Sequence, residues 1–183
     1  MGFDLDKKNV LGRVDKSKKQ SVDEDIVELI NNINEKDNYY TTSSCSGRIS
    51  VWREGDRKDR GEWLFVTHNP LTDEDRTNIK KILENPPQET LWLRAEPFII
   101  HITCRTADAA KELLTRARQC FKKSSILAPG DMPTVEIKGS SFLDMPLSQN
   151  KELKLQNIDF FLDEANKKLK RTKEKTKDFM VSL

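Results

Sequence analysis

The sequence predicts an α+β protein, in which helices flank a mixed, largely antiparallel sheet within a single domain, and one long helix follows at the C-terminus. Segments with strand-like and helix-like apolar spacing alternate along the chain, which favours a mixed fold class. Charged or polar turn residues join neighbouring strands, as in antiparallel hairpins. No glycine-rich turn joins a strand to a helix, and this excludes a Rossmann-like cofactor site.

In the N-terminal half, apolar spacing predicts two helices and then a hairpin. The first helix is expected over residues 5–18, and the next begins at Ser21, where Glu24 completes a capping box. Two strands then follow at residues 48–53 and 63–67, joined by a charged connection.

The C-terminal half continues the alternation of helices and strands. A helix starts within residues 70–75, and residues 90–104 are extended but divided by Pro97 into two short strands. Thr106 caps a further helix. The last elements expected are strands at 125–128 and 134–138 and one long helix over 148–179. We therefore place one domain at residues 1–147 and a C-terminal helix with a basic tail at 148–183.

Composition limits the class of protein. Of the 183 residues, 34% are charged, and neither a membrane span nor the apolar core of a signal peptide is evident. The three cysteines, Cys45, Cys104 and Cys120, are odd in number and widely spaced, which argues against a disulfide framework and against a zinc site. We expect a reducing compartment, no bound metal and a cytoplasmic location.

Basic residues concentrate near the C-terminus, although the net charge is only +2. Between residues 167 and 177, seven basic side chains accompany one acidic side chain. Such a run is typical of a solvated helix face, and the alternative is a surface that contacts phosphates without reading sequence. The basic residues are Lys167, Lys168, Lys170, Arg171, Lys173, Lys175 and Lys177.

Residues 41–48 form the most distinctive segment of the chain. Six small or hydroxyl-bearing residues precede Gly47 and Arg48. Ser and Thr leave the backbone accessible, Gly permits unusual dihedral angles, and Arg offers a fork of donors. The segment is either a concave loop that holds an oxyanion or carboxylate, or a polar turn that satisfies its own backbone.

Other residues admit a catalytic and a structural interpretation. His101 lies on an expected strand, where it is either a hydrogen-bonded core residue or a proton acceptor, and His68 is expected in a turn. Cys45 is either a reactive thiol or a small packing element. Tryptophans such as Trp63 are either core residues or platforms for a nucleobase.

Taken in order, several motifs resemble the tRNA wybutosine-synthesising protein family, which methylates the tricyclic wyosine base. The resemblance covers roughly residues 5–146. Two motifs are specific, Thr42-Ser43-Ser44-Cys45-Ser46-Gly47-Arg48-Ile49 and Glu96-Pro97-Phe98-Ile99-Ile100-His101-Ile102. The series also includes Gly61-Glu62-Trp63, Val66-Thr67-His68, residues 117–126 and Val135-Glu136-Ile137-Lys138-Gly139-Ser140.

The resemblance implies an S-adenosylmethionine-dependent N4-methyltransferase that acts on the 4-demethylwyosine-type base beside the anticodon of phenylalanine tRNA. It implies a fold unlike the Rossmann-like methyltransferases, with residues 1–147 as the methyltransferase domain. Transient contact with other enzymes of the wybutosine pathway would also be consistent with this function. One motif departs from the family, because Cys120 and Ser125 stand where the family usually carries glycines.

On this basis we assign expected roles to individual residues. The polar segment would hold the methionine carboxylate of the cofactor or a tRNA phosphate, and His101 or Glu136 would accept the proton. Trp63 and Phe98 would flank the base or the adenine, and basic side chains would contact the tRNA backbone. The expected cofactor residues are Ser43, Ser44, Ser46, Gly47 and Arg48, and the expected basic contacts are Lys138, Lys167, Lys168, Lys170 and Arg171.

Two other functions would also fit the sequence. One is a non-catalytic RNA-binding module, which would not bind S-adenosylmethionine. The other is an interaction protein, in which an apolar seam between Leu155 and Leu169 pairs with a partner helix.

Overall fold

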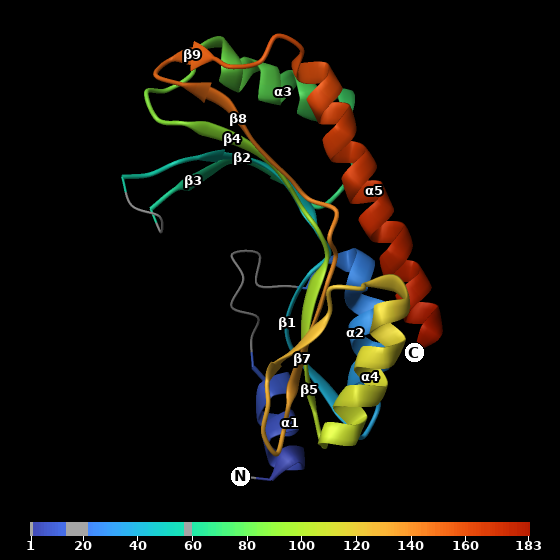
Figure 1. The fold of residues 1–183 in the computed structure, drawn as a ribbon. Helices are drawn as coiled ribbons and strands as arrows, with labels where there is room; N and C mark the ends of the chain where they lie inside the picture. The colour runs from blue at the N-terminus through green and yellow to red at the C-terminus, as the bar shows by residue number, and fades with distance from the viewer. Residues whose placement is uncertain (1, 14–21, 57–59) are drawn as a thin grey trace. The chain divides into compact units, whose positions relative to one another are not determined.

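The computed structural model describes residues 2–13, 22–56 and 60–183. The chain divides into two compact units, and it passes between them at four points along the sequence. The first unit comprises Met1–Ser46, Phe98–Ser140 and Lys173–Leu183, and the second comprises Gly47–Pro97 and Ser141–Thr172. Each unit has its own sheet (Figure 1). Each also has its own hydrophobic core.

The α+β class and the long C-terminal helix are confirmed, but the strands form two sheets where one was expected. All strand pairings described are antiparallel. Apolar spacing identifies strands one at a time and does not reveal which strands pair. The strands on either side of Pro97 join different sheets, and no local pattern announces this separation.

The sheet of the first unit has the strand order β1-β5-β7-β6. The edge strand β1 pairs with β5. On its other side, β5 pairs with β7 along five residues, from Ile99 to Thr103. The strands are β1 (Tyr39–Cys45), β5 (Ile99–Cys104), β6 (Ser125–Ala128) and β7 (Thr134–Lys138).

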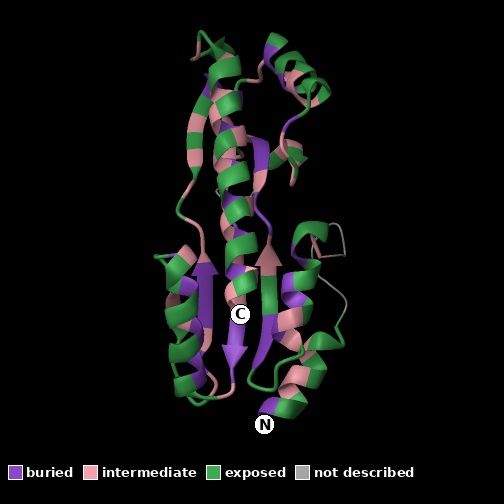
Figure 2. Cartoon of the chain, turned by 90° about the vertical axis from the view of Figure 1, so that its right-hand side faces the viewer, coloured by how far each residue is buried: buried purple, intermediate pink, exposed green. Residues whose placement is uncertain are grey.

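Helices cover one face of this first sheet. Ile100 and Ile102 of β5 belong to a core that also contains residues of α2, α4 and the end of α5, whereas His101 points to the opposite face. On that opposite face α1 packs through Phe3 against Tyr40, with 5.1 Å between the ring centroids. The strands are largely buried and the helices present exposed residues (Figure 2). The helices are α1 (Phe3–Leu11), the 3₁₀ turn η1 (Glu24–Ile26), α2 (Val27–Asn34) and α4 (Ala107–Cys120).

The sheet of the second unit has the order β3-β2-β4-β8-β9. Ile49, Val51 and Leu93 of its strands pack with α3 and with the early residues of α5. The elements are β2 (Arg48–Arg53), β3 (Glu62–Thr67), α3 (Asp73–Glu84), β4 (Leu91–Glu96), β8 (Leu143–Gln149), β9 (Glu152–Leu153) and α5 (Ile158–Ser182). Residues of α5 up to Thr172 belong to the second unit, and those from Lys173 belong to the first.

Two expected elements differ from the structure. Residues 41–45, expected as loop, are the end of β1, and only Ser46 and Gly47 separate β1 from β2. The long helix begins at Ile158, because Asn150 and Lys151, with φ of 53° and 63°, form a two-residue hairpin turn between β8 and β9. The Asn157 side chain then accepts a hydrogen bond from the Phe160 backbone at the start of α5.

Local capping signals located the other helices more accurately. Thr72 and Asp75 form a reciprocal capping box at the start of α3, and Thr106 accepts from the Ala109 backbone at the start of α4. The first helix runs from Phe3 to Leu11, and Gly12 is its C-cap. Residues 14–18 of the expected helix and the capping box expected at Ser21 lie outside the described residues.

The turn after α4 forms without the glycines that the family usually carries. Neither Cys120, the last residue of α4, nor Ser125, the first of β6, has a positive φ. Ser124 closes the turn with its backbone and its hydroxyl, which both donate to the Phe121 carbonyl. The replacements therefore impose no left-handed backbone strain.

None of the described helices is long and apolar enough to span a membrane.

Candidate active site

A row of hydrogen-bonded polar side chains crosses three strands of the first sheet. The Ser43 hydroxyl lies 2.8 Å from Nδ1 of His101, and Nε2 of the same ring lies 3.1 Å from Glu136 Oε2. The other carboxylate oxygen of Glu136 lies 2.6 Å from the Lys138 ammonium. Residues separated by up to 95 positions are thus brought into one network, because His101 is paired directly with Ser43 on β1 and with Glu136 on β7. We call Ser43, His101, Glu136 and Lys138 the polar row.

A β-bulge directs Ser43 into this row. The register between β1 and β5 shifts between Thr41 and Ser43, so that Thr42 is the extra residue. The Thr42 hydroxyl donates to the backbone carbonyl of His101, at 3.4 Å, and Ser43 reaches its ring. Bulges commonly re-aim a side chain beside an active site, and this one does so within the most distinctive segment of the sequence.

Solvent access falls from Ser43 through His101 to Glu136. Ser43 is exposed, the His101 side chain is 26% exposed, and the Glu136 side chain is 12% exposed. Hydrogen bonds from Lys138 and then from His101 lower the pKa of Glu136, and burial opposes them. Glu136 is therefore an ionised carboxylate at neutral pH, which suits it to orient the imidazole and to stabilise its cationic form. It is a weak proton acceptor in its own right.

The tautomer of His101 follows from these partners. An ionised carboxylate only accepts hydrogen bonds, so Nε2 carries the hydrogen in the neutral ring and donates to Glu136. Nδ1 is then the acceptor, and the Ser43 hydroxyl donates to it. The ring is poised to receive one proton at Nδ1.

The turn after β1 has other partners. The Ser46 backbone amide donates to Asp23 at 2.9 Å, and Ser46 is only 2% exposed. Gly47 has a φ of 95°, a conformation that side-chain-bearing residues rarely adopt, so the glycine is required by the turn itself.

In the second unit, arginine and tryptophan side chains form a continuous surface on β2 and β3. Arg48 is ion-paired with Glu96, and its guanidinium carbon lies 4.4 Å from the centroid of the Trp63 ring. Trp63 meets Trp52 edge-on, with 5.8 Å between centroids. Gly61 lies directly against the Trp52 indole, because a Cβ there would fall 1.9 Å from a ring carbon. We call Arg48, Trp52, Trp63 and their neighbour Arg94, which lies over Trp52 at 5.6 Å, the Arg–Trp surface.

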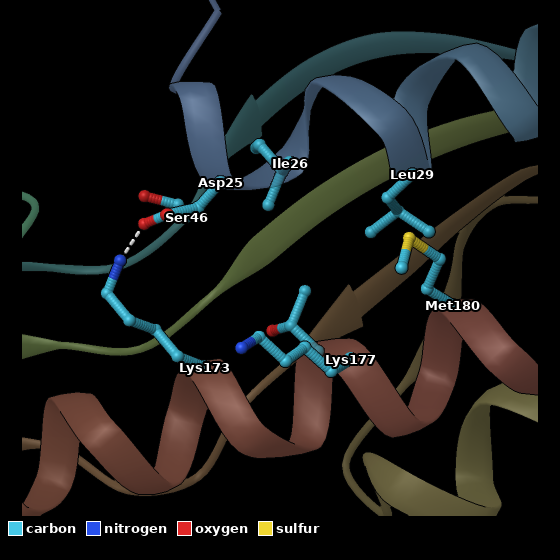
Figure 3. A pocket seen from close by; sticks show the side chains of 8 residues that line it. Asp25, Ile26, Leu29, Ser46, Lys173, Lys177 and Met180 are labelled. Carbon is cyan, nitrogen blue, oxygen red and sulfur yellow. Dashed lines mark hydrogen bonds and ion pairs between the residues drawn. The ribbon is translucent and has the colours of Figure 1, made fainter.

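A small cavity of about 110 Å³ lies beside Ser46 in the first unit (Figure 3). Ile26 and Leu29 form an apolar wall with Met180 of α5. Lys173 borders the cavity and forms an ion pair with Asp25, and Lys177 lies one turn further along α5. Burial lowers the pKa of Lys173.

Comparison with known proteins decides the family. The family model described as Methyltransferase TYW3 matches residues 5–183. The chain belongs to this methyltransferase family.

Individual relatives support the assignment to this methyltransferase family. A protein from Thermococcus sibiricus, named tRNA(Phe) 7-((3-amino-3-carboxypropyl)-4-demethylwyosine(37)-N(4))-methyltransferase, is 36% identical over 180 residues, which cover 94% of this chain and 90% of that protein. A Homo sapiens protein named tRNA wybutosine-synthesizing protein 3 homolog is 33% identical, with 94% and 69% covered. A solved structure of a protein from Pyrococcus horikoshii matches with a TM-score of 0.86 and 32% identity, covering 98% of this chain and 95% of that one.

Within this member of the methyltransferase family, the structure brings together His101 and Glu136, the two alternative proton acceptors expected from the sequence, with Lys138, which was expected to contact the tRNA backbone. Phe98 is different, because it is fully buried and stacks on Phe121 with 5.2 Å between centroids. Its burial makes it a core residue in place of the expected contact with a base.

The basic run on α5 is not one uniform face. Lys167, Lys170 and Arg171 are exposed and Lys168 is half-buried, while Lys173 is turned to Asp25. Lys167 lies 2.5 Å from Glu164, an ion pair between neighbouring turns of the helix. The sequence signal for a basic surface therefore covers residues with different environments.

Sequence reasoning missed three contributions to these sites. Asp23 and Asp25 flank Glu24 of the expected capping box, and nothing local links them to Ser46 or Lys173. The contact of Trp52 with Gly61 did have a signal, since a glycine beside a strand often marks close approach of another group.

Proposed function

We propose that this chain transfers a methyl group to N4 of a 4-demethylwyosine-type base next to the anticodon of phenylalanine tRNA, a step of wybutosine synthesis. The polar row carries the proposal, because it supplies an oriented imidazole with an acceptor nitrogen in a chain of the Methyltransferase TYW3 family. Relatives with 36% and 34% identity bear names that state this reaction.

S-adenosylmethionine supplies an electrophilic methyl group on its sulfonium. The acceptor nitrogen carries a proton that must leave when the new bond forms, so a nearby base accelerates the reaction. Of the two residues expected for this role, His101 is the base, because Glu136 is held ionised by Lys138 and by His101 itself. Glu136 stabilises the imidazolium that results.

The cavity beside Ser46 fits one part of the cofactor. Its apolar wall suits an aliphatic chain, and the ammonium groups of Lys173 and Lys177 suit a carboxylate. These two features meet in the methionine part of S-adenosylmethionine. We therefore place Ser46 and the neighbouring Ser44 and Gly47 at the cofactor, with Ser46 at the cavity wall.

The Arg–Trp surface fits the RNA. Aromatic rings and guanidinium planes stack on unpaired bases of any sequence, as in the anticodon loop. The Arg48 guanidinium lies over Trp63, and Arg48 does not line the cavity beside Ser46. We therefore assign it to this surface and to a tRNA phosphate or base in preference to the cofactor carboxylate. Lys138, Lys168 and the exposed Lys167, Lys170 and Arg171 add electrostatic contacts to the tRNA backbone.

The alternatives from the sequence fit less well. Leu162, Ala165 and Leu169 are buried in the core of the second unit, so the seam that would pair with a partner helix is already covered. A module that only binds RNA would not need an imidazole that is hydrogen-bonded at both ring nitrogens. The residues proposed for proton transfer all lie within residues 1–147, which we propose as the catalytic part of the chain. A tRNA substrate and the absence of a membrane-spanning helix among those described fit our proposal of a cytoplasmic location.

A methylation assay tests this function. The purified chain is incubated with labelled S-adenosylmethionine and phenylalanine tRNA from cells that lack this step, and the nucleosides are resolved by mass spectrometry. The wild-type chain adds one methyl group to the wyosine-type base, and His101→Gln lowers kcat by about 10²- to 10⁴-fold, the usual value of a positioned base.

Matched variants separate chemistry from folding. Glu136→Gln removes the charge beside the imidazole and lowers kcat, whereas Glu112→Gln makes the same chemical change at an exposed ion pair on α4 and leaves kcat unchanged. Binding of tRNA without any methyl transfer by the wild-type chain would instead support the RNA-binding module.

A further inference from the structure

We propose that the Ser43 hydroxyl takes part in the proton transfer, as the group that accepts the substrate proton while passing its own to His101. This inference rests on the proposed methyltransferase function and changes the role that the sequence suggested for Ser43, which was to hold the cofactor. The structure carries the inference through the contacts of the His101 ring.

Both ring nitrogens of His101 already have hydrogen-bond partners. Nε2 is bonded to Glu136 at 3.1 Å, and Nδ1 is bonded to the Ser43 hydroxyl at 2.8 Å. A substrate proton therefore reaches Nδ1 by way of the Ser43 oxygen, with no rearrangement of the row. A hydroxyl suits this position, because it donates one hydrogen bond and accepts another at the same time.

The exposure of the side chains also supports a role for Ser43 in the proton transfer. Ser43 is the exposed end of the chain of contacts from Ser43 through His101 to Glu136, and exposure falls steadily toward Glu136. Ser43 is thus the member of this chain of contacts that a substrate reaches most readily from solvent. Lys138 contacts Glu136 at the other end of the polar row and takes no part in the proton transfer from Ser43 to His101.

The bulge explains why Ser43, and not its neighbour, occupies the position. Thr42 is the extra residue in β1, and its hydroxyl bonds to the His101 carbonyl at 3.4 Å. Two adjacent hydroxyls of the same strand thus face the same residue, one at the ring and one at the backbone. This gives a matched pair of positions for an experiment.

The step balances without any further reactant. The lone pair of the acceptor nitrogen forms the new N–CH₃ bond as the S–CH₃ bond breaks, and the sulfonium becomes a neutral thioether. The proton on the nitrogen moves to the Ser43 oxygen, and the Ser43 proton moves to His101 Nδ1. The imidazolium next to the Glu136 carboxylate then releases its proton to solvent by the reverse path.

Kinetics of three variants test the role of the hydroxyl. Ser43→Ala lowers kcat by about 10- to 100-fold with little change in the KM for S-adenosylmethionine, as expected for the loss of one proton-transfer group. Ser43→Thr restores most of kcat because it keeps the hydroxyl. Thr42→Ala, the matched control on the same strand, stays within about twofold of the wild type, because its hydroxyl does not touch the ring.

Two measurements that do not depend on methyl transfer complete the test. Binding of S-adenosylmethionine to Ser43→Ala, followed by calorimetry, keeps the wild-type Kd. Nitrogen-15 NMR of the His101 ring in the same variant shows a changed Nδ1 signal, because the donor to Nδ1 is gone.

The outcomes are distinct. A large rise in Kd with kcat unchanged would overturn the proposal and return Ser43 to the cofactor site. Wild-type kcat in Ser43→Ala would also overturn it, because His101 would then receive the proton directly. Failure of the proposed function itself would appear separately, as absence of methylation by the wild-type chain while the NMR contact between Ser43 and His101 persists.

Discussion

The two units of the chain use polar residues in opposite ways. In the first unit, Ser43, His101 and Glu136 are joined end to end by hydrogen bonds on a sheet face. In the second unit, Arg48 and Trp63 are stacked, and the arginine charge is neutralised by Glu96. Hydrogen-bonded rows move protons, whereas stacked planes recognise flat groups. On the function proposed above, proton transfer belongs to the first unit and recognition of RNA to the second.

The largest effect is expected at Phe98, which the sequence placed in the site and the structure places in the core. Phe98→Ala should lower the free energy of unfolding by about 3–5 kcal/mol, because it leaves a cavity beside Phe121. Phe98→Leu, which keeps most of the volume, should bind tRNA as the wild type does. Chemical denaturation and a tRNA binding assay check both. Loss of tRNA affinity in a folded Phe98→Leu protein would support the contact between Phe98 and the base that the sequence suggested.

Arg48 tests the recognition half of the comparison. Arg48→Met should weaken tRNA binding by about 1–2 kcal/mol, roughly tenfold, and should reduce the salt dependence of binding by about one phosphate contact. Affinity for S-adenosylmethionine should not change. Arg53→Met, at the other end of β2 and ion-paired with Glu62 at 2.5 Å, is the matched control. If Arg48→Met left the affinities for both tRNA and cofactor intact, Arg48 would have no anchoring role.

Lys138 tests the electrostatics of the polar row through pH. The folded pKa of Glu136 is lowered chiefly by Lys138, so this interaction contributes stability that is present above the unfolded pKa, 4.5, and is lost as pH falls through the folded value. Lys138→Met should therefore destabilise the protein by about 1 kcal/mol at pH 7, a figure discounted for the exposure of Lys138, and by less as the pH falls below 4.5.

Denaturation of wild type and Lys138→Met across this pH range measures the difference directly. A destabilisation that stays constant from pH 7 to pH 3 would mean that the lysine acts through packing of its aliphatic stem and not through Glu136.

The smallest effect is expected on α5. Replacing exposed Lys170 and Arg171 by Ala should change stability by less than about 0.5 kcal/mol. Affinity for tRNA should fall mainly at low salt, because the contacts are electrostatic. Lys111→Ala, an exposed residue of α4 paired with Asp108, should leave the salt dependence as it is. An unchanged salt dependence in the double variant would make this part of the run a solvated helix face.

Local signals predicted local structure well. Thr106 marked a helix start because an N-cap acts within one turn, and residues 70–75 contained the start of another helix. Pro97 divided two strands because it lacks a backbone donor. The segment 41–45 was expected as loop, because Ser and Thr are read as turn residues when no apolar alternation accompanies them. In the folded protein its pairing with β5 supplies the partners that make it a strand.

The sequence identified individual residues of the candidate site but did not show which of them are in contact. His101 and Glu136 were both candidates, but their contact depends on the register of β5 with β7 over 35 positions. Phe98 and His101 lie on one short segment, yet the alternation of the strand and the turn at Pro97 separates a buried ring from a half-exposed one. Whether such a residue lies in the core or in the site depends on pairing between strands that are far apart in the sequence. Local sequence patterns do not reveal this pairing.

The division of the chain into interleaved units has a consequence for its synthesis. Phe179 is fully buried in the core of the first unit and stands 6.0 Å from Phe121, so that core stays incomplete until the ribosome has made α5. The strands that carry Ser43, His101 and Glu136 are all translated earlier. Domains usually fold in the order in which they emerge. Here the sheet with the candidate active site emerges before α5. A nascent chain arrested before α5 would hold every residue proposed for proton transfer on a core that lacks Phe179.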